Sequence, residues 1–265
     1  MTTSGIQSKP WGNGLPRPGR WSGRVTLAAL LLLTHPIPGV AQSDMLPQVD
    51  QPTLIKWWHG AIVLGGLSGL MLLDQPAQRL AQRNRTESGN DMAHSIRHLG
   101  QPEIYGSVTL GLLGAGMVSG NQELTRSGGR LAVTLALAGV ASGAAKLALG
   151  RPRPYESSDA DSYVPFSGQE AMPSGHTTMA FAFATALSDD IRRPWATVGL
   201  YTLAVGVGWS RINDNHHWLS DVAAGAVLGI TSAKLVNGRW QIFNLRPPSV
   251  LIGPEKATVA WQVAF

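Results

Sequence analysis

Long apolar segments alternate with short polar ones along most of this chain. Most of these apolar segments are longer than an ordinary strand, and alanine and leucine dominate several of them, which favours helices over strands. The six segments span residues 57–73, 104–119, 130–149, 176–188, 195–209 and 218–236. We therefore predict an all-α fold, in which about six core helices form a bundle.

The end of the chain has a different pattern. Residues 257–265 alternate apolar and polar positions, as in a strand with one covered face. The preceding Gly-Pro-Glu-Lys sequence is typical of a turn, and residues 249–252 before it are again apolar. We expect these two stretches to pair in a short C-terminal β-hairpin that covers one end of the helical domain.

The first 41 residues have the three-part layout of a secretory signal peptide. Four basic residues and no acid precede or flank the apolar run at 25–33, and small residues ending in Ala41 follow a helix-breaking stretch. Nine strongly apolar residues are short for a membrane span of about 20, which favours cleavage before Gln42. We predict a signal peptide over 1–41 and one domain over 42–265, exported to the periplasm or to the periplasmic face of the inner membrane.

The charge of the chain argues against binding to nucleic acid. The net charge is +5, but residues 42–265 carry 17 basic and 16 acidic side chains. Binding to nucleic acid requires basic side chains clustered on one face, and this near-balance does not supply them. The chain has no cysteine, which excludes thiol catalysis and thiolate–metal sites.

The apolar segments fit a membrane only in part. Most are at or below the roughly 20 residues that a span requires, and the mean hydropathy of +0.03 is low for a protein with six spans. Their many small residues suit close helix packing in lipid or in water. We expect a bundle that lies in or against the membrane, with residues 73–91 as a solvent-facing connector.

Three polar clusters stand beside these apolar segments. Charged and imidazole groups are costly in such places unless they are paired or functional. The clusters are KLALGRPRP at 146–154, MPSGHTT at 172–178 and SRINDNHHWLSD at 210–221. We consider each of them as a source of catalytic groups.

In the third cluster, helical spacing selects one histidine. If a helix begins near His216, then His217 and Asp221 are four residues apart on the same face. The carboxylate then accepts a hydrogen bond from one ring nitrogen, which raises the basicity of the other nitrogen. His216 is rotated away from Asp221, so we interpret it as a flanking residue, and we assign no role to Asp214.

The second cluster predicts an anion site. Ser174 and Gly175 lie at the expected start of a helix, where unpaired N–H groups and the helix dipole favour an anion. Gly175 allows close approach to the backbone, and Ser174 adds a hydroxyl donor. His176, in the first turn, is placed to donate a proton to a group bound there.

The first cluster adds cations. Lys146 and Arg153 are seven residues apart, close to the same helical face, although Gly150 and Pro152 are expected to end the helix between them. Arg151 is off that face. Lys146, Arg153 and Arg211 together would form a site for a tetrahedral oxyanion such as phosphate, and the sequence has no carboxylate cluster to hold a metal.

These residues and their spacing resemble the three-part signature of the type 2 phosphatidic acid phosphatase superfamily. That superfamily includes lipid phosphatases, bacterial class A nonspecific acid phosphatases and vanadium haloperoxidases. The resemblance covers residues 146–221. Its positions are Lys146-x6-Arg153-Pro154, Pro173-Ser174-Gly175-His176 and Ser210-Arg211-x5-His217-x3-Asp221.

The resemblance implies a role for each of these residues. His217 would be the nucleophile that forms a phosphohistidine, and Asp221 would orient it. His176 would protonate the leaving alkoxide and then activate water. The remaining positions would hold the phosphate oxygens without a metal or another cofactor: Lys146, Arg153, Ser174, Gly175 and Arg211.

The substrate and the reaction class leave alternatives open. The apolar helices favour a lipid substrate, such as phosphatidate or a polyprenyl diphosphate, over the small phosphate ester of a soluble periplasmic acid phosphatase. A vanadium haloperoxidase would use the same anion site, but this chain is shorter than is usual in that family. A non-catalytic protein that binds lipid head groups is a fourth hypothesis, against which the intact nucleophile, acid and orienting carboxylate argue.

Overall fold

The computed structural model describes residues 52–242, 249–252 and 257–260. The predicted signal peptide at 1–41 lies outside these residues. The helices of the described part are α1 (Trp57–Met71), α2 (Asp74–Arg83), α3 (Glu87–Leu99), α4 (Pro102–Ser119), α5 (Gln122–Leu149), α6 (Gly175–Ile191), α7 (Pro194–Asn213) and α8 (Leu219–Val236). The strands are β1 (Thr53–Ile55), β2 (Trp240–Ile242), β3 (Ser249–Ile252) and β4 (Ala257–Ala260).

The predicted all-α class is confirmed, and the six apolar segments correspond to α1, α4, α5, α6, α7 and α8. The bounds differ most at α5, which begins at Gln122 instead of 130. Asn121 explains this earlier start, because its side chain accepts hydrogen bonds from the amides of Glu123 and Leu124 at 3.0 and 3.1 Å. Such a cap stabilises a polar first turn that hydrophobic periodicity alone does not detect.

The solvent-facing connector predicted at 73–91 is largely exposed, as expected, but it is helical. These residues form α2 and the beginning of α3. The segment is rich in Ala, Gln and Arg, which favour helices, and the Thr86 hydroxyl caps α3 by accepting a hydrogen bond from the Gly89 amide at 3.1 Å. Asp74, at the start of α2, is completely buried.

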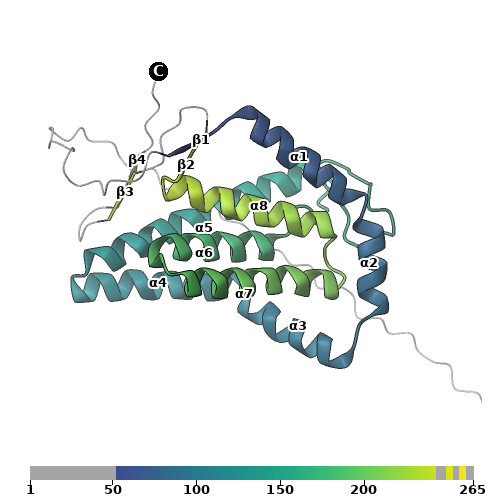
Figure 1. Cartoon of the computed structure of the whole chain (residues 1–265), viewed down its shortest axis with the longest axis horizontal. Coiled ribbons are helices and arrows are strands. Elements are labelled where there is room, and N and C mark those ends of the chain that lie inside the picture. Colours follow the sequence, from purple (N-terminus) through teal and green to yellow (C-terminus); the bar gives the residue numbers. More distant parts are fainter. Residues whose placement is uncertain (1–51, 243–248, 253–256, 261–265) are drawn as a thin grey trace, which may run out of the picture. The chain divides into compact units, whose positions relative to one another are not determined.

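Helix α6 lies at the centre of the helical packing. It contacts α5, α7 and α8, and α4 packs against α5. Figure 1 shows α4 to α8 running side by side, with α1 and α2 bent across the end where α7 finishes and α8 begins. The core is built mainly from alanines of α6 around Phe181, together with Leu131 and Leu135 of α5.

Two glycines set the distance between α6 and α8. A Cβ atom on Gly229 would lie 2.3 Å from the carbonyl oxygen of Thr178, and one on Gly225 would lie 2.7 Å from that of Ser174. Both distances are too short for real contacts, so only glycine permits this approach. The close packing brings the start of α6 to the first turn of α8, where the Ser174 amide donates a hydrogen bond to the Asp221 carbonyl at 3.0 Å.

The four strands form two small pairs. β3 and β4 are antiparallel, with Ser249 opposite Ala260, which confirms the hairpin predicted for 249–252 and the first part of 257–265. Residues 261–265 lie outside the described part of the chain. β1 and β2 pair in parallel between opposite ends of the domain, a contact that local sequence patterns do not reveal.

Among the described residues, two helices, α5 and α8, are long and apolar enough to cross a membrane. The pair α1 and α2, bent by 50° at its break, would count as a third span. α1 has no buried residue, and large apolar side chains such as Ile62 and Leu64 are about two-thirds exposed. Such apolar surface is typical of a helix that faces lipid or another apolar partner.

Candidate catalytic site

The predicted site residues lie at helix ends and in the loops that join them. Gly150, with a φ of 56°, ends α5 just after Lys146. A Cβ atom there would lie 1.8 Å from the carbonyl oxygen of Val164, so glycine is required at this turn. Ser174 is the N-cap of α6, as predicted, while Arg211 lies in the last turn of α7.

His217 is buried in the loop before α8. Its Nδ1 lies 2.8 Å from the carbonyl oxygen of Ala171. Because a carbonyl oxygen can only accept, Nδ1 carries the proton and Nε2 carries the lone pair. No described residue forms a hydrogen bond with Nε2. The ring therefore presents a nucleophilic nitrogen, oriented by a main-chain carbonyl.

Asp221 does not make the predicted hydrogen bond with His217. The helix α8 begins at Leu219, not near His216, so His217 precedes it, and its Nδ1 lies 3.7 Å from Asp221 Oδ2. Instead, Oδ2 accepts a hydrogen bond from the amide of Trp218 at 2.8 Å, which caps the helix. Asp221 is close enough to stabilise a positive charge on the ring, but the carbonyl of Ala171 fixes the tautomer.

Two further buried residues bind Asp221. Arg151 donates a hydrogen bond to Asp221 Oδ1 at 2.6 Å, and it forms a second ion pair with Asp74 at 2.6 Å. We predicted that Arg151 lies off the functional face, but its position after the end of α5 turns it into the core. The sequence alone did not identify Asp74. Its place at the end of an apolar segment could have indicated a buried ion pair, because an unpaired acid there would be costly.

The start of α6 forms the centre of the anion site. Ser174 is fully buried, and its hydroxyl oxygen accepts a hydrogen bond from the hydroxyl of Thr177 at 3.0 Å. The Lys146 side chain reaches this turn, since its Cε lies 3.8 Å from the place that a Cβ on Gly175 would occupy. Its ammonium group donates a hydrogen bond to the carbonyl oxygen of Glu170. A cation and the first amides of a helix therefore meet there.

Arg211 offers a donor that the described protein leaves unused. Its side chain is 5% exposed, and its Nε is buried without a hydrogen-bond partner among the described residues. Its Nη1 lies 3.5 Å from Asp214 Oδ2, and Arg97 reaches the same oxygen at 3.3 Å. Asp214, to which we assigned no role, thus holds Arg211 from one side while Nε stays available to an anion.

Arg153 and His216 lie together. Arg153 Nη1 is 3.5 Å from His216 Nδ1, and the guanidinium stands 5.9 Å from the centre of the Tyr155 ring. The His216 ring meets the same tyrosine edge to face, with 5.2 Å between centroids. His216 is therefore a neighbour of Arg153, a predicted phosphate ligand. The spacing of His216 from Asp221 in the sequence did not suggest this contact.

Burial and nearby cations keep the site histidines neutral. Burial lowers the pKa of His217 to about 4, and Lys146 and Arg211 contribute to that decrease while Asp221 opposes it. Burial, followed by the charge of Arg211, also lowers the pKa of His176 to about 4. These electrostatic interactions link residues from α5, α6, α7 and the loop before α8. A bound anion would raise the pKa of both rings.

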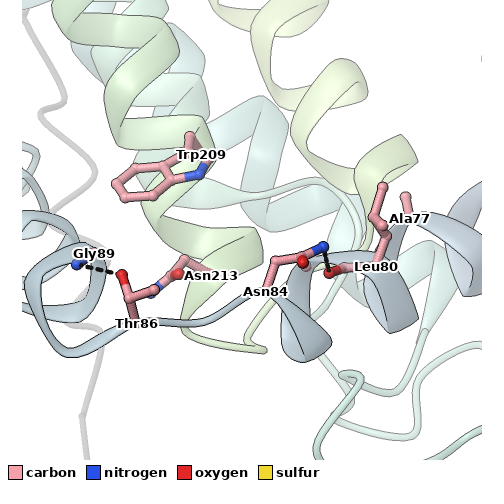
Figure 2. A pocket seen from close by; sticks show the side chains of 8 residues that line it. Ala77, Leu80, Asn84, Thr86, Gly89, Trp209 and Asn213 are labelled. Carbon is pink, nitrogen blue, oxygen red and sulfur yellow. Dashed lines mark hydrogen bonds between the residues drawn. The ribbon is translucent and has the colours of Figure 1, made fainter.

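One hollow among the described residues lies away from this cluster. It measures about 310 Å³ and lies between α2, the turn after it and the end of α7. Figure 2 shows Trp209 and Asn213 of α7 facing Leu80, Asn84 and Thr86. None of the predicted site residues lines it, so we do not place the chemistry there. Nor do any three His, Cys, Asp or Glu side chains of the described residues gather to hold a metal ion.

Comparisons with known proteins find similar phosphatases. The chain is 40% identical over 127 residues to a lipid A 1-phosphatase of Porphyromonas gingivalis, which covers 46% of this chain and 26% of that protein. It is 29% identical over 89 residues to a putative undecaprenyl-diphosphatase of Escherichia coli, covering 34% of this chain and 44% of that protein. The chain thus spans less than half of the length of these relatives.

A solved structure shares the fold. The transmembrane PAP2-type phosphatidylglycerolphosphate phosphatase of Bacillus subtilis superposes with a TM-score of 0.55 at 22% identity, over 69% of this chain and 92% of that one. Residues 127–244 match the PAP2 superfamily, and this stretch contains the whole predicted signature at 146–221. The match to this type 2 phosphatidic acid phosphatase superfamily is therefore shown for residues 127–244, somewhat less than half of the chain.

Proposed function

We propose that this protein hydrolyses a phosphate monoester or diphosphate of a lipid, with His217 as the nucleophile. The observation that carries the proposal is the state of the His217 ring. Its Nδ1 is held by the carbonyl of Ala171, so the lone pair lies on an Nε2 without a partner among the described residues. The buried and unpartnered Nε of Arg211 supplies a donor for the phosphate oxygens in the same site.

The first chemical step forms a phosphohistidine. The lone pair of His217 Nε2 attacks phosphorus while the bond between phosphorus and the ester oxygen breaks. His176 gives its proton to the leaving oxygen. The charge on the non-bridging oxygens is stabilised by Lys146, Arg153 and Arg211, with the Ser174 hydroxyl and the Gly175 amide as further donors.

The second step returns the enzyme to its starting state. A water molecule attacks the phosphohistidine as neutral His176 accepts one of its protons, and the bond between phosphorus and Nε2 breaks. Phosphate leaves, and His217 regains its lone pair. Asp221, 3.7 Å from Nδ1, stabilises the positive charge that the ring carries in the intermediate. The scheme uses no metal and no cofactor.

The empty and the bound site favour different protonation states of His176. In the empty site its pKa is about 4, so it is neutral near pH 7. A phosphate dianion adds negative charge beside the ring and raises the pKa, which lets His176 act as an acid only after substrate has bound. His217 meets the opposite requirement, because it must be neutral when it attacks.

A lipid substrate is supported by the surface and by the relatives. α5 and α8 are long and apolar enough to cross a membrane, and the signature residues lie at or near the ends of these and neighbouring helices. The relatives are named for lipid A and for undecaprenyl diphosphate. We include both with phosphatidate as candidate substrates, and we place the site on the periplasmic side of the inner membrane, where the signal peptide predicted at 1–41 would direct it.

Phosphate release from a panel of substrates tests this function. The panel contains phosphatidate, lipid A, undecaprenyl diphosphate and a soluble phenyl phosphate, each with wild type and His217→Ala in detergent, with and without a metal chelator. We expect release from at least one lipid, no effect of the chelator, and loss of activity in the variant. Activity on phenyl phosphate alone would indicate a soluble-ester phosphatase. Activity that survives in His217→Ala would overturn the proposed nucleophile. Oxidation of bromide with vanadate and peroxide, without phosphate release, would indicate a haloperoxidase instead of a phosphatase.

A further inference from the structure

A second set of buried charges lies directly behind the candidate nucleophile. Arg151 is completely buried between the carboxylates of Asp74 and Asp221, at 2.6 Å from each. Ser220 joins the same cluster, because its amide and hydroxyl donate hydrogen bonds to Asp74 at 2.8 and 2.5 Å. The Arg151 side chain also donates to the carbonyl oxygen of Ala160, at 2.9 Å from Nε. Every oxygen of both carboxylates accepts a hydrogen bond, so the geometry of this cluster is tightly determined.

The cluster connects three separate parts of the chain. Asp74 is the first residue of α2, immediately after the 50° break from α1. Arg151 follows the end of α5, while Ser220 and Asp221 lie in the first turn of α8. None of these contacts is local, since Asp74 lies 146 residues before Ser220. The bent pair α1 and α2 is thereby fixed to the helix that carries Asp221.

Counting charges shows what Asp74 contributes. One guanidinium stands between two carboxylates, so the three groups together carry a charge of −1. Without Asp74, the charge of Asp221 would be balanced by Arg151, and the cluster beside His217 would be neutral. His217 becomes positively charged when its Nε2 bonds to phosphorus, and a neutral cluster would stabilise that charge less.

We propose that Asp74 is a positioning residue of this site, which acts through Arg151 and Ser220 to fix the Asp221 carboxylate and to keep the cluster behind His217 negative. The inference rests on the proposed function of the same site. Asp74 itself touches neither His217 nor the anion site in the contacts of the described residues. Its effect therefore passes through Asp221, which lies 3.7 Å from the His217 ring.

Three variants separate the charge of Asp74 from its structural contacts. Asp74→Asn keeps the shape of the side chain and makes the cluster neutral. Asp74→Asn combined with Arg151→Gln restores the charge of −1 by leaving Asp221 as its single ion. The matched control is Asp190→Asn, because Asp190 forms a partly buried 2.6 Å ion pair with Arg130 between α6 and α5, outside this cluster.

The assay uses the full chain in detergent, with the lipid and phenyl phosphate substrates of the panel above for turnover and vanadate for binding. In Asp74→Asn we expect kcat to fall about 10- to 100-fold with KM changed less than about threefold, because the reacting groups are displaced or less stabilised. Vanadate, which bonds to the same Nε2, should bind about tenfold more weakly. The double variant should recover at least about half of the loss on a logarithmic scale, and Asp190→Asn should resemble wild type.

Several results would overturn the proposal. One is a folded Asp74→Asn protein with the kcat and vanadate affinity of wild type. Another is an equal loss in Asp190→Asn, which would indicate a general effect of losing a buried ion pair. A folded double variant that recovers nothing would refute the charge argument. If the double variant does not fold, the vanadate affinities of Asp74→Asn and Asp190→Asn test the proposal. Equal affinities would overturn it.

The vanadate series also separates this proposal from the proposed function. A wild type that binds vanadate but releases phosphate from no substrate would overturn the hydrolytic function alone. The order of vanadate affinities among the variants would then still show whether Asp74 acts on the His217 site.

Discussion

Replacing Gly229 with alanine should lower the rate of catalysis, although Gly229 lies more than two helical turns after Asp221 on α8. In the native packing, the added Cβ would lie 2.3 Å from the Thr178 carbonyl oxygen and 2.8 Å from the Ala182 amide nitrogen. Ordinary contact begins at 3.4 Å, and both neighbours are backbone atoms that cannot rotate away. α6 and α8 must therefore separate by about 1 Å, a displacement that can cost about 100-fold in rate when it reaches reacting groups.

The displacement matters because the two helices carry opposite sides of the site. α6 begins at Ser174 and His176, while Asp221 lies in the first turn of α8. Overpacking costs about 1 to 3 kcal/mol, and the better helix propensity of alanine offsets up to about 1 kcal/mol of that cost. We thus expect a modest loss of stability together with a large loss of kcat.

Gly139→Ala is the control for this variant. Gly139 is exposed on α5, and no atom lies within 4 Å of the place its Cβ would take, so only the propensity gain applies. Thermal unfolding in detergent and phosphate release should be measured for both variants. We expect their free energies of unfolding to differ by about 1 to 3 kcal/mol, with wild-type activity in Gly139→Ala. Equal stability and equal activity of the two variants would refute the assigned packing of α6 on α8.

Three further outcomes can be measured on the same protein. The pKa values of His176, His216 and His217 are each lowered to about 4, so the folded protein binds fewer protons than the unfolded chain. Its stability should therefore be complete above about pH 6.5 and decrease as the pH falls toward 4. A melting temperature that rises on acidification would contradict this. Arg211→Lys removes the buried Nε donor, and kcat/KM should fall at least about tenfold, whereas an unchanged value would place the phosphate elsewhere. Asn121→Ala removes the cap of α5 and should cost about 1 kcal/mol in unfolding without changing kcat, while a loss of activity at equal stability would show that the cap reaches the site.

The sequence predicted the helices better than it predicted their ends. The length of the apolar segments located six of the helices, including α1, which has no buried residue. It failed at 73–91, where α2 is polar along most of its length and is fixed instead by Asp74 and by hydrogen bonds such as that from Gln78 to Asn215 at 2.8 Å. Long-range contacts of this kind leave no periodic trace in the chain, so a polar helix can resemble a connector.

The site shows the same limit at the level of single atoms. Side-chain spacing selected His217 and Asp221, yet it assigned to Asp221 a hydrogen bond that the carbonyl of Ala171 makes. Any residue supplies a carbonyl, so sequence alone cannot reveal which one meets the ring; only the path of the loop before α6 decides it. That path is itself fixed by Arg151, whose carbonyl oxygen accepts a hydrogen bond from the Ala171 amide at 2.9 Å. Arg151 therefore acts on the His217 ring from two directions, with its side chain on Asp221 and its main chain on Ala171. Because a substitution changes only the side chain, Arg151 variants should disturb the charge behind His217 and leave the tautomer of the ring in place.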